Sequence, residues 1–293
     1  MKSEGVRVMT FMEEEEAMAA RFFELIAAVT DYMRQSINPK FDALINPNRR
    51  ETYIHGLYSR AVAWMMTLKR LDQAVDFQAV MSAVRSLMEI TVDLILIHHD
   101  KTDTSAFRMR QWEVSAKMKA AKALVEYFTN RAKLPIPDEY QPQVDFIDRE
   151  EANVELMRKG LWPYTGSDPK RQSKGTHPDR WTGNSLSTDV IKADSLHGPE
   201  IKKIFGSNLE EFYETEYRRL NWSVHGSGLA GVWNLPPEVF HSMCGLAFIW
   251  CARMAMICSL IVLSEFRAVG MAEHLPELSE EALRICALLT PLD

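Results

Sequence analysis

The longest apolar stretch of the chain places the strongest constraint on its fold. Residues 245–263, GLAFIWCARMAMICSLIVL, contain one charged residue, Arg253, and follow the helix-starting pair Pro236 and Pro237. A stretch of this length is nearly long enough to cross a bilayer, but an arginine at its centre would cost about 2.5–3.5 kcal/mol there. We therefore expect residues 236–269 to form a central core helix and not a membrane span.

The other segments also predict helices. Apolar residues that recur at steps of three and four are typical of a helix with one buried face. Such spacing occurs in residues 11–37, 49–75, 77–99, 103–131, 142–158, 207–228 and 278–289. We find no segment with the period of two that a half-buried strand requires.

We therefore predict an all-α fold, a single domain of five to seven long helices. The N-terminal helices are expected over residues 11–131 and the C-terminal helices over residues 207–289. Residues 161–198 carry three prolines and almost no apolar periodicity, so we expect a large irregular loop there.

Charge and cysteine content limit the partners and the compartment. The net charge is −6, which does not attract RNA or an anionic membrane, so any RNA contact would need a local basic patch. The four cysteines form no CxxC pair, and we expect reduced, buried thiols in a cytoplasmic protein. The acidic N-terminus lacks the apolar region of a signal peptide, and no membrane partner is expected.

Residues 207–228, SNLEEFYETEYRRLNWSVHGSG, read as one helix with its own start and stop signals. Ser207 and Glu210 have the spacing of a capping box, in which each side chain satisfies a free backbone N–H group. Gly226 and Gly228 can adopt the left-handed conformation that ends a helix. The segment therefore predicts a defined helix whose second half is basic.

The second half of this helix carries the candidate chemistry. Arg218 and His225 are seven residues apart, so they share one face of the helix. Histidine can move protons near neutral pH, and the guanidinium fork of arginine matches phosphate oxygens. Together they could cleave RNA without a metal, with Arg219, Asn221 and Tyr217 beside them. In the alternative interpretation, His225 interacts favourably with the helix dipole at the C-terminal end, and Arg218 forms an ion pair with Glu214.

Two further groups of polar residues are candidates for binding. Arg85, Glu89 and Asp93 recur at every fourth position of an otherwise apolar helix, which predicts a buried polar network that either orients two helices or forms a site. In the loop, basic and aromatic residues are interleaved, which indicates either a surface loop or a lid that binds phosphates and stacks bases. These loop residues are Lys170, Arg171, Lys174, Arg180 and Trp181.

The sequence indicates no cofactor and no metal. No Gly-rich phosphate loop, GxSxG motif or HExxH motif is present. His98 and His99 are adjacent, so on a helix their side chains point about 100° apart. A metal held across helices by Glu89, His98 and His225 is a third alternative.

Two resemblances follow from these motifs. An arginine followed after four to six residues by a histidine, as in Arg218 or Arg219 with His225, resembles the signature of the HEPN superfamily. A second resemblance is to an uncharacterised bacterial family with Arg-x-x-x-Glu and Tyr-Arg-x-Leu-Ser-x-x-Val-His-Gly motifs. The corresponding residues here are Arg85 with Glu89, Trp181 with residues 184–186, and residues 217–226, with Asn221 where that family more often has serine.

The HEPN resemblance implies an all-helical, dimeric ribonuclease or RNA-binding effector of a defence or toxin system. In that interpretation His225 is the acid and base, Arg218 or Arg219 binds phosphate, and Tyr217 and Asn221 position the substrate. The first alternative is a non-enzymatic binding or regulatory protein with a buried network of Arg85, Glu89, Tyr217 and His225. The second is a metal-dependent helical enzyme.

Overall fold

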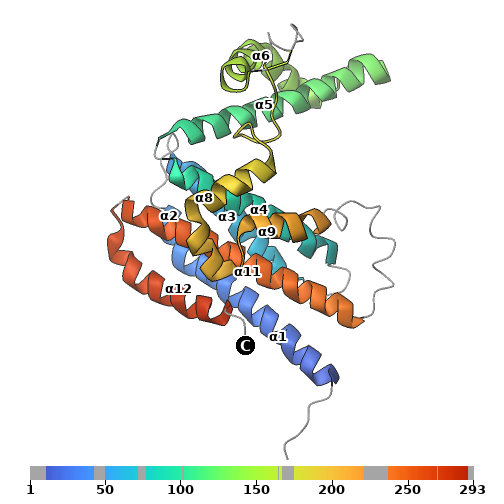
Figure 1. Cartoon of the computed structure of the whole chain (residues 1–293). Coiled ribbons are helices and arrows are strands. Elements are labelled where there is room, and N and C mark those ends of the chain that lie inside the picture. Colours follow the sequence, from blue (N-terminus) through green and yellow to red (C-terminus); the bar gives the residue numbers. More distant parts are fainter. Residues whose placement is uncertain are drawn as a thin grey trace, which may run out of the picture. The chain divides into compact units, whose positions relative to one another are not determined.

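A computed structural model describes residues 11–42, 50–71, 77–100, 102–163, 165–166, 175–220, 237–268 and 270–289. Within these ranges most of the chain is helical and none of it forms a strand, which confirms the all-α prediction (Figure 1). The helices are α1 (Phe11–Asp31), α2 (Asn38–Asp42), α3 (Arg50–Leu68), α4 (Phe77–His99), α5 (Thr104–Glu126), α6 (Gln141–Leu161), α8 (Leu186–Phe205), α9 (Leu209–Phe212), α11 (Pro237–Ala268) and α12 (Leu275–Leu289). Short π-helical or 3-10 turns cover Tyr32–Ile37, Tyr127–Ala132, Asp138–Tyr140, Tyr213–Tyr217 and Ala272–His274.

The chain forms two compact units. The core unit comprises Met1–His99 and Val190–Asp293, and the hairpin unit comprises Asp100–Asp189. Compactness alone does not define independent folding, so the single-domain expectation stays a prediction.

Helix α11 is the central element of the core unit. It packs against α1, α3, α4 and α12, and its apolar side chains, such as Met254, Ile257 and Ile261, are buried. The segment Met243–Arg267 is long and apolar enough to cross a membrane, a test that core helices of soluble proteins also pass, and 72% of its most apolar window is buried inside the structure. The prediction of a central core helix is therefore confirmed.

Arg253 has a structural role in α11. Its guanidinium donates hydrogen bonds to the carbonyl of Phe205 at 2.8 Å and to the carbonyl of Leu289 at 3.1 Å. These carbonyls end α8 and α12, where helices lack internal donors. The charged residue within the apolar helix therefore caps the C-terminal ends of two other helices.

The hairpin unit is built on α5 and α6, which pack against each other. Lys122 of α5 pairs with Glu151 of α6. His177 and Pro178 contact α5. The indole of Trp112 donates to the carbonyl of Pro178 at 3.0 Å, and the hydroxyl of Ser115 lies 3.0 Å from Nδ1 of His177.

The predicted loop over residues 161–198 is wrong in its second part, because α8 begins at Leu186. The Ser185 hydroxyl accepts a hydrogen bond from the backbone N–H of Thr188 at 3.2 Å, as an N-terminal cap does. Buried Val190, Ala193 and Ile201 then line one face. The last part of the predicted loop is therefore the start of a helix.

Candidate functional site

The candidate site lies on the helix that starts with α9. A side chain of α8 accepts hydrogen bonds from the N-terminal end of this helix. Asn208 caps this helix, since its side-chain oxygen accepts from the N–H of Glu211 at 2.8 Å. The carboxylate of Asp194 in α8 accepts from the N–H groups of Leu209 at 2.9 Å and Glu210 at 2.7 Å. Three free N–H groups are thereby satisfied, and the negative charge of Asp194 interacts favourably with the positive end of the helix dipole.

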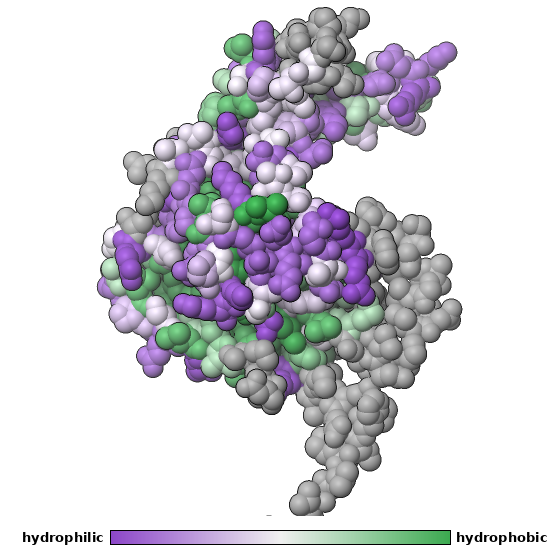
Figure 2. Space-filling view, viewed as in Figure 1, coloured by the Kyte–Doolittle hydropathy of each residue, from purple (hydrophilic) through white to green (hydrophobic). Residues whose placement is uncertain are grey.

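The predicted capping box of Ser207 and Glu210 is therefore wrong by one residue. Asn208 is the cap, and the N–H of Glu210 is bonded to Asp194. The sequence could not show this, because Asp194 lies 16 residues before Glu210. The exposed side of α9 carries acidic residues, and Figure 2 shows a hydrophilic surface over it.

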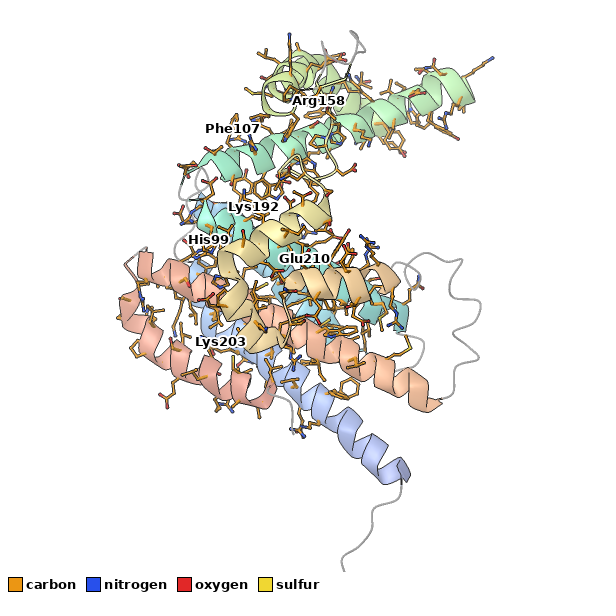
Figure 3. All side chains as sticks on the ribbon, viewed as in Figure 1. His99, Phe107, Arg158, Lys192, Lys203 and Glu210 are labelled. Carbon is orange, nitrogen blue, oxygen red and sulfur yellow. The ribbon has the colours of Figure 1, made fainter. Side chains whose placement is uncertain are left out.

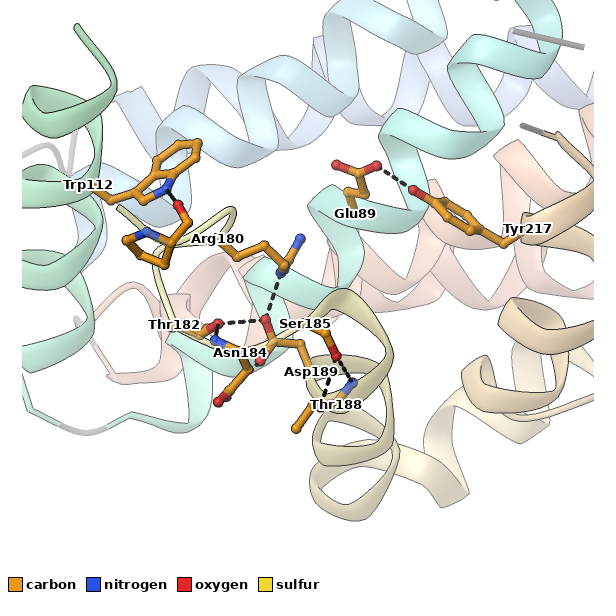
Figure 4. Close-up of polar contacts among 10 residues, drawn as sticks. Glu89, Trp112, Arg180, Thr182, Asn184, Ser185, Thr188, Asp189 and Tyr217 are labelled. Atoms are coloured by element: carbon orange, nitrogen blue, oxygen red, sulfur yellow. Dashed lines mark hydrogen bonds and ion pairs between the residues drawn. The ribbon is translucent and has the colours of Figure 1, made fainter. Parts of the chain in front are cut away.

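Tyr217 anchors the far end of the same helix to α4. Its hydroxyl donates a hydrogen bond to Oε1 of Glu89 at 2.5 Å (Figure 4). The same hydroxyl accepts a hydrogen bond from Nη2 of Arg85 at 3.3 Å. The Arg85 guanidinium also lies 5.3 Å from the centre of the Tyr217 ring. Burial, and next the bond to Glu89, raises the pKa of Tyr217 to about 12. The hydroxyl is therefore a neutral donor at physiological pH.

The expected polar network on α4 is present in part. Arg85 and Glu89 lie 3.8 Å apart, but their side chains are 25% and 41% exposed, so the pair is not buried as predicted. Asp93, one turn further along α4, is half-buried. Tyr217, which is 5% exposed, is the third member of the network. We call the contact of Arg85, Glu89 and Tyr217 the tyrosine cluster.

Arg218 and Arg219 come directly after Tyr217 in the sequence, and their side chains are exposed to solvent. Nη2 of Arg218 donates to Glu214 at 2.9 Å, which confirms the ion pair considered as an alternative, and its guanidinium lies 5.5 Å from the centre of the Tyr213 ring. Arg219 lies 3.5 Å from Glu216. The two arginine side chains are 59% and 67% exposed. Both guanidinium groups are therefore accessible to a ligand.

Several predicted site residues lie outside the described residues. They are Asn221 and His225, which follow Leu220 in the sequence, and the loop residues Lys170, Arg171 and Lys174.

Arg180 and Trp181 are placed differently from the predicted lid. The Arg180 Nε donates to the carboxylate of Asp189 at 2.6 Å, and Thr182 and Asn184 donate to the same carboxylate at 2.7 and 3.1 Å (Figure 4). Asp189 is fully buried, and Trp181 is 5% exposed. A buried carboxylate requires such partners, so these side chains hold the hairpin unit together and are not presented to solvent for base stacking.

A second polar cluster in the core unit had no strong signal in the sequence. Glu265 of α11 is 1% exposed, and it accepts a hydrogen bond from Nη2 of Arg50 at 2.7 Å and contacts Nδ1 of His98. Arg50 also donates to the carbonyl of His98 at 2.7 Å. The one available signal was a lone acidic residue near the end of an apolar helix. Its partner is 215 residues away in sequence.

The metal site considered across Glu89, His98 and His225 does not fit the described residues. Glu89 and His98 are nine residues apart on α4, which separates them by about 13.5 Å along the helix axis. Glu89 contacts Tyr217, whereas His98 contacts Glu265. Among the described residues no group of three or more His, Cys, Asp and Glu side chains is arranged to hold a metal ion.

These features define an all-α protein whose core unit carries a tyrosine cluster and exposed arginines at the end of a short capped helix. The chain belongs to the family of unknown function DUF5677, whose model matches residues 51–234, more than half of the chain. The expected membership of an uncharacterised family is thus confirmed, and the HEPN resemblance stays a prediction. No curated protein and no solved structure matches the chain.

Proposed function

We propose that this protein binds RNA and cleaves it without a metal ion, as HEPN-like ribonucleases do. The observation that supports the proposal is the position of Arg218 and Arg219. They lie, 59% and 67% exposed, on a turn that Tyr217 fastens to α4. The two cations are therefore available on a fixed backbone, immediately before the segment that contains His225.

Each residue has a role that its chemistry suits. Arg218 or Arg219 binds the phosphate and stabilises the charge that develops on it, for which the guanidinium fork is suited. His225 accepts a proton from the 2′-hydroxyl and returns one to the leaving oxygen. Asn221 orients the substrate. Tyr217 acts as a positioning residue through Glu89, because its hydroxyl is already bonded.

The ion pairs of the two arginines do not prevent phosphate binding. Exposed pairs one turn apart on a helix contribute only about 0.3–0.5 kcal/mol. A phosphate therefore displaces Glu214 or Glu216 at little cost. The net charge of −6 makes the local patch necessary, and a cytoplasmic homodimer would bring two such patches together.

The test is cleavage of a mixed RNA pool in the presence of EDTA. We expect cleavage by the wild type, loss of cleavage with His225→Ala, and weakened, salt-sensitive RNA binding with Arg218→Ala and Arg219→Ala combined. Arg284→Ala, an exposed arginine on α12, is the matched control. If the folded wild type neither binds nor cleaves RNA, the proposal is wrong.

A second candidate function is a non-enzymatic binding or regulatory protein. It is favoured by the burial of Tyr217 and its bonds to Glu89 and Arg85, which indicate that this helix is an architectural anchor. Circular dichroism of His225→Ala distinguishes the two candidates. A variant that loses its helical signal assigns the histidine to the architecture, and a folded variant that loses only cleavage assigns it to catalysis.

A further inference from the structure

A buried serine and a histidine of the hairpin unit form a hydrogen-bonded pair. The hydroxyl of Ser115, which is 0% exposed, lies 3.0 Å from Nδ1 of His177 and has no other partner among the described residues. Because a buried hydroxyl donates its proton wherever an acceptor is in reach, Nδ1 is the acceptor. In the neutral ring the proton then lies on Nε2. Within the described part of the chain this Nε2–H group has no acceptor of its own.

Two basic residues come from the two helices of the hairpin unit. Lys119 lies one turn after Ser115 and therefore on the same face of α5. Arg158 lies on α6, which packs against α5 (Figure 3). The segment that leads to His177 runs against the end of α6, because a Cβ atom at Gly175 would lie only 2.6 Å from the carbonyl carbon of Arg158. The fold thus brings both basic residues to the histidine.

Neither cation is neutralised by a carboxylate of the described residues. Lys122, one turn from Lys119 on α5, pairs with Glu151. Within the described ranges Lys119 and Arg158 form no ion pair, and Nε of Arg158 is buried without a hydrogen-bond partner. A buried donor without an acceptor is costly. This guanidinium therefore has a donor that an anionic ligand could satisfy.

The charges around His177 favour a neutral imidazole. Burial lowers the pKa of His177, Lys119 and Arg158 lower it further, and Asp179 acts in the opposite direction. Since the ordinary value is already below 7, the ring is uncharged at physiological pH and keeps its Nε2–H donor. Two cations beside a neutral N–H donor attract an anion.

We propose that Lys119, Arg158 and His177 bind a phosphate group. The guanidinium fork of Arg158 matches phosphate oxygens, Lys119 adds a flexible ammonium group, and the Nε2–H of His177 donates a third hydrogen bond. Ser115 is a positioning residue, because its hydroxyl fixes the proton of the imidazole on Nε2. The site shares no residue with the proposed RNA-cleaving site and does not depend on that function.

The experiment follows the pKa of His177 in the full-length chain by proton NMR, with His177→Gln to identify the ring signal. An anion beside the ring stabilises the imidazolium, so inorganic phosphate should raise this pKa by about 1. Chloride at the same ionic strength is the control, because it only screens the two cations. A rise with phosphate no larger than the rise with chloride would overturn the proposal.

Three variants test whether the two cations are responsible. Read from the same signal, the affinity for phosphate should fall at least about tenfold with Arg158→Gln and about threefold with the exposed Lys119→Gln. Lys117→Gln is the matched control, since Lys117 is also exposed but two residues earlier and so on another face of α5. Equal losses at Lys117 and Lys119 would contradict the site. If a variant fails to fold, the comparison of phosphate with chloride in the wild type remains decisive.

The same signal identifies the source of the phosphate. A short single-stranded RNA with 2′-O-methyl groups and no terminal phosphates offers only diesters and cannot be cleaved through a 2′-hydroxyl. A rise in the pKa of His177 with this RNA assigns the site to a nucleic-acid backbone. A rise with inorganic phosphate alone assigns it to free phosphate or a phosphomonoester. Either response should persist when Arg218→Ala and Arg219→Ala are combined, which separates this site from the exposed arginines of the core unit.

Discussion

At the scale of single residues, the tyrosine cluster shows what a sequence pattern can and cannot reveal. The spacing of Arg85 and Glu89 indicated a pair on one helix, and the structure places them 3.8 Å apart. Their third partner, the Tyr217 hydroxyl, is 128 residues away from Glu89. Only tertiary packing decides such a contact, so the sequence named all three residues in one alternative but could not assign their bonds.

The hydroxyl of Tyr217 should contribute measurably to stability. Tyr217→Phe keeps the ring under the Arg85 guanidinium but removes the bond to Glu89. We expect a loss of about 0.5–1.5 kcal/mol in the free energy of unfolding, because Glu89 is solvated enough to find water instead. Urea unfolding followed by circular dichroism measures it. Tyr213→Phe, in the stacked neighbouring ring, is the control, and an equal loss there would contradict the assignment.

The raised pKa of Tyr217 also predicts a dependence of stability on pH. In the unfolded chain the hydroxyl releases its proton near pH 10, whereas in the folded protein it does so near pH 12. The folded state therefore holds more protons in this interval, and its stability falls as pH rises from about 10 to about 12. Unfolding curves across this range should show a smaller decline for Tyr217→Phe than for the wild type. Identical declines in the two proteins would show that the pKa of Tyr217 is not raised.

At the scale of elements, most long helices were predictable from their apolar periodicity, whereas α8 (Leu186–Phe205), which begins among polar residues, was not. The prediction of residues 77–99 agrees with α4 (Phe77–His99), and that of residues 142–158 is close to α6 (Gln141–Leu161). Helix α8 was missed because the three prolines and the weak apolar periodicity of residues 161–198 suggested a loop, although α8 begins at Leu186. Long apolar periodicity outweighs local signals, whereas caps depend on distant side chains such as Asp194.

The start of α8 should depend strongly on Asp189. Its buried carboxylate accepts hydrogen bonds from Arg180, Thr182 and Asn184. Asp189→Ala leaves the guanidinium of Arg180, 11% exposed, without this partner. Breaking a buried pair in this way costs about 3–5 kcal/mol.

Chemical denaturation followed by circular dichroism tests this expectation. The control is Asp179→Ala, which removes an exposed carboxylate beside Arg180 in sequence. A stability of Asp189→Ala within the error of that control would show that the carboxylate does not hold the hairpin unit together.

At the scale of the whole molecule, the residues that the family model matches are not the same as the residues that form the core unit. The match covers residues 51–234 and so ends before α11. Yet α11 is the helix on which α3 and α4 of the matched region pack. The proposed RNA-binding arginines lie within the match, but α4, to which Tyr217 bonds their helix, packs on α11 beyond it.

A fragment limited to residues 51–234 should therefore fail to form a stable core. Without α11, the buried faces of α3 and α4 are exposed to water, at about 25 cal/mol for each Å² of apolar surface. We expect weak thermal cooperativity and binding of a hydrophobic dye by the fragment, compared with the full chain under the same conditions. A cooperative transition at the full chain's melting temperature would show that α11 is dispensable.

The same packing predicts an order of thiol reactivity across the full chain. Cys251 and Cys258 of α11 are buried, and burial raises the pKa of Cys258 to about 12. Cys244 and Cys286 are half-buried. Because the thiolate is the reactive form, a chromogenic disulfide reagent should modify Cys244 and Cys286 first, and all four thiols only after denaturation. Mass spectrometry of the partly labelled chain identifies the modified residues. Labelling of Cys251 and Cys258 as fast as of the other two would show that α11 is not enclosed by α1, α3, α4 and α12, and the core unit described above would then be incorrect.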